Sequence, residues 1–126
     1  LIPTESTTSV EFELPVLARS LERASLLTHE SRNNVVKMTL DVQNQLVKLQ
    51  GDSPEIGNVE EEIGFKNLEG EGLTISFNPD YLREALRASI TDSIIMNFTQ
   101  PLRPFTVVPA KQDVNFTQLI TPVRTF

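Results

Sequence analysis

The sequence lacks cysteine and tryptophan, and it holds a single histidine, His29. Without cysteine the chain has no disulfide framework, no thiolate metal site and no cysteine nucleophile. One histidine excludes a histidine-rich zinc site, and beside Glu30 and Arg32 at an expected helix end it is interpreted as a cap or a solvated side chain. The five glycines are scattered, so there is no glycine-rich phosphate loop, and no Gly-x-Ser-x-Gly motif occurs. We therefore expect no catalytic residues, no metal and no cofactor.

Long apolar runs are also absent, because the longest span only a few residues and a bilayer requires roughly 20. The chain starts at Leu1 without a charged segment before an apolar core, which argues against a secretory signal. A length of 126 residues matches one domain and suffices to bury a core. The sequence predicts one cytoplasmic domain over 1–126 with no membrane partner.

Positive charge is scarce, with 11 Lys and Arg against 17 Asp and Glu, and the net charge of -6 argues by itself against a nucleic-acid partner. The negative charge is concentrated, however, because six glutamates lie in 55–71 and only Lys66 opposes them. Consecutive glutamates on a strand point alternately to opposite faces and converge poorly on a metal ion. The segment is interpreted as an edge strand protected by charge, or as a docking surface for a basic partner.

Helical and strand periods alternate along the chain. Helices are expected over 15–28 and 79–89, each with a proline at its start. Strand patterns cover 9–14, 35–40, 45–49, 59–65, 73–77, 93–98, 105–109 and 117–123. About eight strands and two helices predict an α+β domain with mainly antiparallel sheets.

An internal repeat is suggested by the two expected helices. Aligned without a gap at Pro15 and Pro79, they share five of twelve residues. Each follows an alternating strand and precedes three strand candidates, which gives the order β-α-β-β-β twice, over about 7–65 and about 72–123. The alternative is that short amphipathic helices resemble one another by composition.

Two pairs of arginines share helix faces at a spacing of four residues, Arg19 with Arg23 and Arg83 with Arg87. If the halves are related by a pseudo-twofold axis, all four guanidinium groups project from one side of the domain. Such a surface suits a phosphate backbone contacted without base specificity. The alternative is a solvated helix face that neighbouring glutamates neutralise.

The ordered set of motifs resembles the C-terminal domain of bacterial DNA polymerase III β subunits, the sliding clamps. The residues that carry the resemblance are Leu1–Pro3, Arg23–Thr28, Arg32–Val36, Ile75–Leu82 and Pro122–Phe126. It covers essentially the whole chain and implies a non-catalytic processivity factor with the DNA-clamp fold. In that family two subunits of three similar domains close head to tail around duplex DNA, and their helices line the hole. The resemblance thus implies a DNA-facing role for the four arginines.

The resemblance also implies a peptide pocket between the second and third domains of a subunit. It receives a Gln-Leu-x-Leu-Phe-like motif from polymerases, the clamp loader and repair proteins. The implied third-domain wall consists of Leu1, Tyr81, Leu102, Pro104, Leu119, Thr121, Val123 and Arg124. Thr121 stands where the family often has Met or Leu, and for Leu102 and Leu119 the alternative is core packing.

Ring closure in the family joins this domain to the first domain of the other subunit. The resemblance places Leu26 and Leu27 at the apolar contact, and Glu55, Glu60 and Glu61 at a charged rim that meets basic residues. A complete subunit is expected to form a homodimeric ring near the nucleoid, whereas this chain is expected to be a monomer whose exposed Leu26 and Leu27 carry a mild risk of association. The alternative function is a free-standing peptide-binding scaffold of the same fold without a DNA role.

Overall fold

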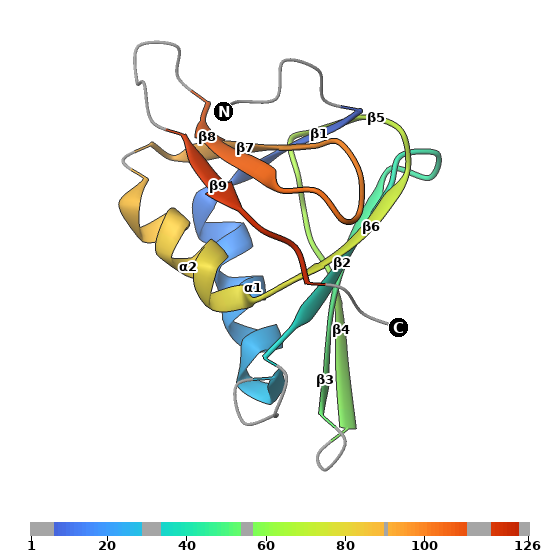
Figure 1. Ribbon diagram of the computed structural model, residues 1–126, viewed down its shortest axis with the longest axis vertical. Helices are drawn as coiled ribbons and strands as arrows, with labels where there is room; N and C mark the ends of the chain where they lie inside the picture. The colour runs from blue at the N-terminus through green and yellow to red at the C-terminus, as the bar shows by residue number, and fades with distance from the viewer. Residues whose placement is uncertain (1–6, 29–33, 54–56, 90, 111–116, 124–126) are drawn as a thin grey trace.

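The computed structural model describes residues 7–28, 34–53, 57–89, 91–110 and 117–123 (Figure 1). Within these ranges two helices and nine strands follow one another in an α+β order. They are β1 (Thr8–Glu13), α1 (Leu14–Thr28), β2 (Val36–Asp41), β3 (Leu46–Ser53), β4 (Gly57–Glu62), β5 (Asn67–Gly70), β6 (Leu73–Phe77), α2 (Pro79–Ala88), β7 (Ser93–Phe98), β8 (Phe105–Pro109) and β9 (Gln118–Ile120).

The strands form two antiparallel sheets, one ordered β5-β1-β7-β8-β9 and the other β4-β3-β2-β6. The two helices lie next to each other, and α1 also packs against β3 and β4 (Figure 1). The apolar side chains between these layers are buried, with the rings of Phe77 and Phe98 packed around Phe105 at centroid distances of 5.3 and 4.9 Å. The expected fold class is confirmed.

Each sheet combines the three strands that follow one helix with the strand that precedes the other helix. Strand β1 pairs with β7, where Phe12 lies opposite Ile94, and β6 pairs with β2, where Phe77 lies opposite Val36. This exchange of first strands relates the halves by a pseudo-twofold axis. The residue limits 7–65 and 72–123 of the two repeats stay predictions.

The strand registers correct the alignment of the two helices by one residue. Phe12 and Phe77 are equivalent, and α1 and α2 start at Leu14 and Pro79, each two residues further on. The gapless sequence alignment instead paired Pro15 with Pro79. Burial agrees with the structural alignment, because it superimposes the buried positions of the two helices, such as Leu17 and Leu82.

This correction separates the arginine pairs. In the structural alignment Arg83 is equivalent to Ala18 and Arg87 to Glu22, so the pairs on α1 and α2 are not symmetry mates. The apparent match arose because both helices repeat Arg at intervals of four residues. The arginines of the two helices match in the sequence alignment, but they do not occupy equivalent positions in the structure.

Strand β5 was not expected from the sequence, because its four residues hold one buried apolar side chain, Leu68, among exposed neighbours. It lies along the outer edge of β1. The chain after β9 also lies along a strand of the other sheet. Val123 N donates a hydrogen bond of 2.7 Å to Ser76 O, which places this segment beside β6. Strand β9 ends at Ile120 rather than continuing to 123, and Pro122 has no N–H group that could donate a hydrogen bond to a neighbouring strand.

Neither described helix is long and apolar enough to cross a membrane.

Candidate functional site

An open cavity of about 670 Å³ lies between α2 and the chain that contains β9. It brings together four of the side chains expected in a peptide pocket, two of which are apolar or aromatic and widely exposed. Its lining residues are Tyr81, Glu84, Ala85, Gln118, Leu119, Ile120, Thr121, Pro122 and Val123. A concave, partly apolar site of this size suits leucine and aromatic anchors.

Local interactions fix the two walls of the cavity. Asn78 caps α2, because its Oδ1 accepts a hydrogen bond of 2.9 Å from Asp80 N, and Pro79 starts the helix without needing a hydrogen-bond partner. Tyr81 therefore stands on the first turn. On the other wall, pairing of β9 with β8 turns Ile120 inward and leaves Leu119 facing out.

The exposure of the wall shows which apolar side chains remain available to a ligand. Tyr81 is 54% exposed and Leu119 is 53% exposed, while neighbouring Ile120 is buried. Large apolar side chains gathered at a concavity mark a binding surface more often than single exposed ones do. Core packing as the alternative for Leu119 is thereby excluded.

The remaining expected pocket residues lie elsewhere. Leu102 and Pro104 belong to the connection between β7 and β8, where both are exposed, and neither lines the cavity. Leu102 is thus not a core residue either. Leu1 and Arg124 lie outside the described residues. The sequence reasoning missed Glu84, although its position one turn after Tyr81 on the same helix placed it beside the pocket.

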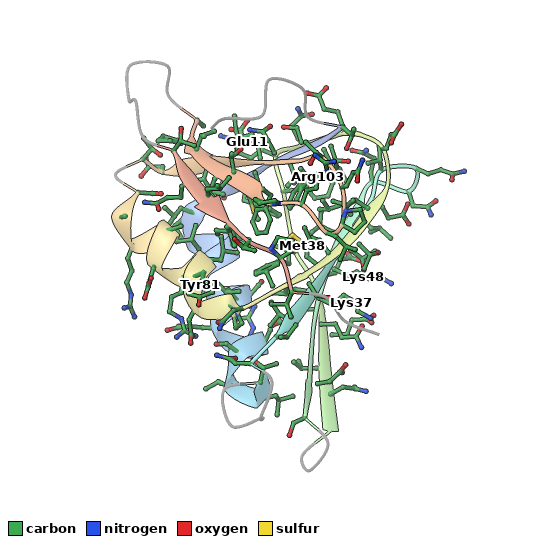
Figure 2. All side chains as sticks on the ribbon, in the orientation of Figure 1. Glu11, Lys37, Met38, Lys48, Tyr81 and Arg103 are labelled. Atoms are coloured by element: carbon green, nitrogen blue, oxygen red, sulfur yellow. The ribbon has the colours of Figure 1, made fainter. Side chains whose placement is uncertain are left out.

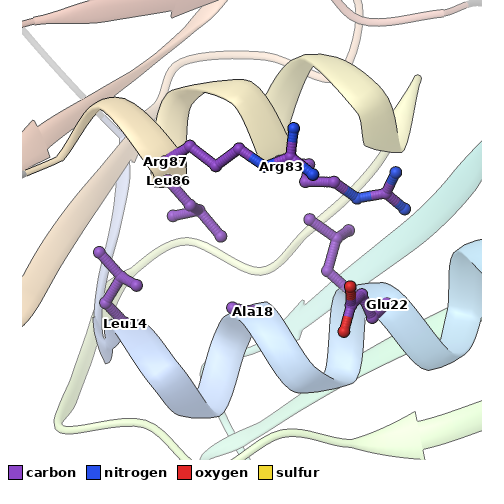
Figure 3. A pocket seen from close by; sticks show the side chains of 7 residues that line it. Leu14, Ala18, Glu22, Arg83, Leu86 and Arg87 are labelled. Carbon is purple, nitrogen blue, oxygen red and sulfur yellow. The ribbon is translucent and has the colours of Figure 1, made fainter.

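A second, smaller groove of about 200 Å³ separates the two helices (Figure 3). Its lining is apolar at the base and charged at the sides, and comprises Leu14, Ala18, Leu21, Glu22, Arg83, Leu86 and Arg87. Figure 3 shows both arginines reaching from α2 and Glu22 reaching from α1. The groove therefore mixes both signs of charge.

The four arginines of the expected DNA-facing surface differ in their surroundings. Arg23 Nε donates to Glu61 Oε1 at 2.7 Å, which turns its side chain toward β4. Arg83 is partly buried: Nη1 pairs with Asp80 of the same helix at 3.4 Å, and Nη2 donates to Ser25 Oγ, which links α2 to α1. Arg19 and Arg87 are exposed. Two of the four arginines thus pair with described carboxylates, and their common DNA-facing role stays a prediction.

The residues expected at the ring joint lie on adjoining elements. Leu26 is 72% exposed on the last turn of α1, and Leu27 beside it is partly buried. Glu60 and Glu61 lie on β4, which packs against α1 and is an edge strand of its sheet. Glu60 forms an exposed pair with Lys48, with 3.7 Å between Oε1 and Nζ. Glu55 lies outside the described residues.

In the part of the chain that the structure describes, no three His, Asp or Glu side chains converge in a way that could hold a metal ion. The arrangement offers binding surfaces: a partly apolar cavity, a helix face that carries arginines, an acidic edge strand, and an exposed leucine at the end of α1.

The chain is similar to a family of bacterial replication proteins along almost its whole length. Residues 1–124 match the family model described as DNA polymerase III beta subunit, C-terminal domain. The beta sliding clamp of Streptococcus pneumoniae serotype 4 (strain TIGR4) is 46% identical over 125 residues, which cover 99% of this chain and 32% of that protein. For the beta sliding clamp of Bacillus subtilis (strain 168) the identity is 40% over 126 residues, covering 100% of this chain and 33% of that protein.

Solved structures agree with these relatives. The DNA polymerase III beta chain from Streptococcus pneumoniae TIGR4 superimposes with a TM-score of 0.94 at 45% identity, covering 99% of this chain and 33% of that chain. The sliding clamp from Bacillus subtilis gives a TM-score of 0.91 at 39% identity, covering 99% of this chain and 32% of that chain. The chain thus spans about a third of the length of the relatives that it matches.

Proposed function

Because the chain belongs to the family formed by the C-terminal domains of DNA polymerase III beta subunits, we propose that it serves as one domain of a sliding clamp. Two full-length copies form a ring that encircles duplex DNA in the bacterial cytoplasm and tethers polymerases, the clamp loader and repair proteins. The domain contributes no catalysis. The single observation that carries this proposal is the match of residues 1–124 to the family model, and the open cavity with Tyr81 and Leu119 exposed supports its peptide-binding part.

In this proposal the cavity receives a Gln-Leu-x-Leu-Phe-like peptide. The apolar side chains of the peptide displace water from Leu119 and Val123, and the ring of Tyr81 supplies an aromatic contact surface. Thr121 offers less apolar area than Met or Leu would offer at that position. Leu102 and Pro104 belong to the wall only if the peptide extends toward the β7–β8 connection.

A peptide titration followed by NMR tests this pocket. Adding a Gln-Leu-Ser-Leu-Phe peptide is expected to shift the signals of Tyr81, Leu119 and Val123, while buried Met38 stays unchanged as an internal control. The chain alone is expected to bind weakly, because the cavity is open on the side where a second domain would stand. A scrambled peptide should leave all four signals in place. Unmoved signals at millimolar peptide would remove the pocket assignment.

The DNA contact is proposed for the face carried by α1 and α2. Arg19 and Arg87 are the strongest candidates, since both are exposed, whereas Arg23 and Arg83 are engaged by Glu61 and by Asp80. A ring holds DNA by topology, so a few non-specific phosphate contacts suffice. The acidic character of the chain as a whole does not oppose this role, because much of it lies on the edge strand β4.

Charge reversal tests the DNA face in the full-length ring. The double change Arg19→Glu and Arg87→Glu is expected to reduce loading on DNA severalfold and to lower the salt dependence of binding by about one unit of slope per lost phosphate contact. Lys37→Glu with Arg103→Glu is the matched control, since both residues are exposed and lie on the side of the sheets (Figure 2). Equal behaviour of the two double variants would count against a DNA-facing role.

A peptide-binding scaffold without a DNA role is the second candidate function. Arg23 pairs with Glu61 and Arg83 pairs with Asp80. These ion pairs favour the scaffold, because they reduce the positive charge that the helix face offers to DNA. Full DNA loading by the Arg19 and Arg87 variant, together with peptide binding, would support the scaffold. For this chain alone we propose a monomer, since the acidic β4 edges of two copies repel each other.

A further inference from the structure

Glu84 introduces a charge into the cavity that the peptide proposal does not use. It lies on α2 one turn after Tyr81, its side chain is exposed, and it lines the cavity. Among the described residues that line the cavity, it is the only charged one. The other described lining side chains are apolar or uncharged, so among them this carboxylate alone contributes a charge to the local potential.

The carboxylate of Glu84 is not neutralised by its neighbours on α2. Within the described ranges, neither a hydrogen bond nor an ion pair engages the Glu84 side chain. Arg83 is held by Asp80 and Ser25, and Arg87 lines the groove on the side that faces α1. The described part of the cavity therefore presents a negative charge that no described cation pairs with, and Arg124 lies outside the described residues.

A ligand that covers the apolar wall brings its own flanking residues close to this carboxylate. A lysine or arginine there gains a favourable interaction, strengthened because the bound peptide excludes part of the surrounding water. An aspartate or glutamate at the same place is repelled. The charge thus selects among peptides whose apolar anchors are identical.

We propose that Glu84 makes this cavity selective for partner segments that carry a lysine or arginine next to the apolar anchors. The inference rests on the proposed peptide-binding function and names a chemical preference that this function alone does not contain.

Calorimetric titration of the native full-length protein tests the preference. The probes are Gln-Leu-Ser-Leu-Phe peptides extended at either end by Lys, Gln or Glu. At low salt the Lys peptide is expected to bind about two- to fivefold more tightly than the Gln peptide at the end nearer Glu84, and the Glu peptide is expected to bind more weakly by a similar factor. At 1 M salt, where screening acts over about 3 Å, the preference should disappear.

Variants separate selection by Glu84 from general electrostatics. Glu84→Gln is expected to remove the preference, and Glu84→Lys to reverse it, each measured as the ratio of the affinities for the Lys and Gln peptides. Glu71→Gln, an equal change of charge at an exposed site outside the cavity, should keep the wild-type preference. If the Gln peptide binds but the Lys preference is absent, or survives in Glu84→Gln, the inference is overturned and the peptide pocket stands. If no peptide binds, the proposed pocket itself falls, and the inference with it.

Discussion

Replacing Leu26 by aspartate is expected to separate the subunits of the proposed full-length ring and to raise their dissociation constant at least about thirtyfold. Leu26 is 72% exposed on the last turn of α1, and α1 packs against the edge strand β4. An apolar side chain at the centre of an interface between two subunits contributes about 2 kcal/mol or more, and a charge in its place adds a cost of desolvation. Analytical ultracentrifugation over a range of concentrations measures the effect.

A matched substitution distinguishes a specific effect at the proposed subunit joint from the general effect of placing a charge on the protein surface. Leu102 is 57% exposed and lies in the β7–β8 connection rather than at the end of α1. Leu102→Asp makes the same chemical change and should leave ring formation as it is in the native protein. If both variants dissociate to the same extent, or neither does, the end of α1 is not the joint.

Replacing Gly51 by alanine is expected to lower the free energy of unfolding by about 1–3 kcal/mol. A Cβ at this position in β3 would lie 2.6 Å from Ala24 O and 3.1 Å from Thr28 Cγ2. The carbonyl is part of the helix backbone and cannot rotate away, so α1 would have to move off the sheet. Because Leu26 lies on the same two turns, we also expect weaker ring formation.

The matched control for this change is Gly64→Ala. A Cβ at Gly64 meets no atom within 4 Å, and the glycine does not need the left-handed backbone region. Its effect on stability should stay within about 0.5 kcal/mol. Urea unfolding of both variants provides the comparison. Equal stability of the two would mean that α1 does not rest on β3 as tightly as the structure has it.

The elements with a strong local signal were predictable. Strand 73–77 alternates cleanly, and Asn78 with Pro79 marks a helix start, so the helix that carries Tyr81 followed from neighbouring residues alone, whereas a pocket at Tyr81 was implied by the resemblance. Strand β5 lacked such a signal, because Leu68 is its one buried side chain and the pairing with β1 joins segments far apart in the chain. Within the cavity, Tyr81 was expected from the resemblance, whereas Glu84 was not expected, although it lies one turn further along the same helix.

The sequence by itself determined two helices and most of the strands, an α+β fold, and a resemblance that the comparisons bear out. These rest on caps, periodicity and ordered motifs, which are properties of short segments. Only the tertiary structure decided how the repeats align and which of the four helix arginines pair with described carboxylates. The Arg23–Glu61 pair joins residues 38 positions apart, and the role of each guanidinium depends on the carboxylate that folding brings to it. Spacing along a helix places a side chain on a face, but its partner comes from another element.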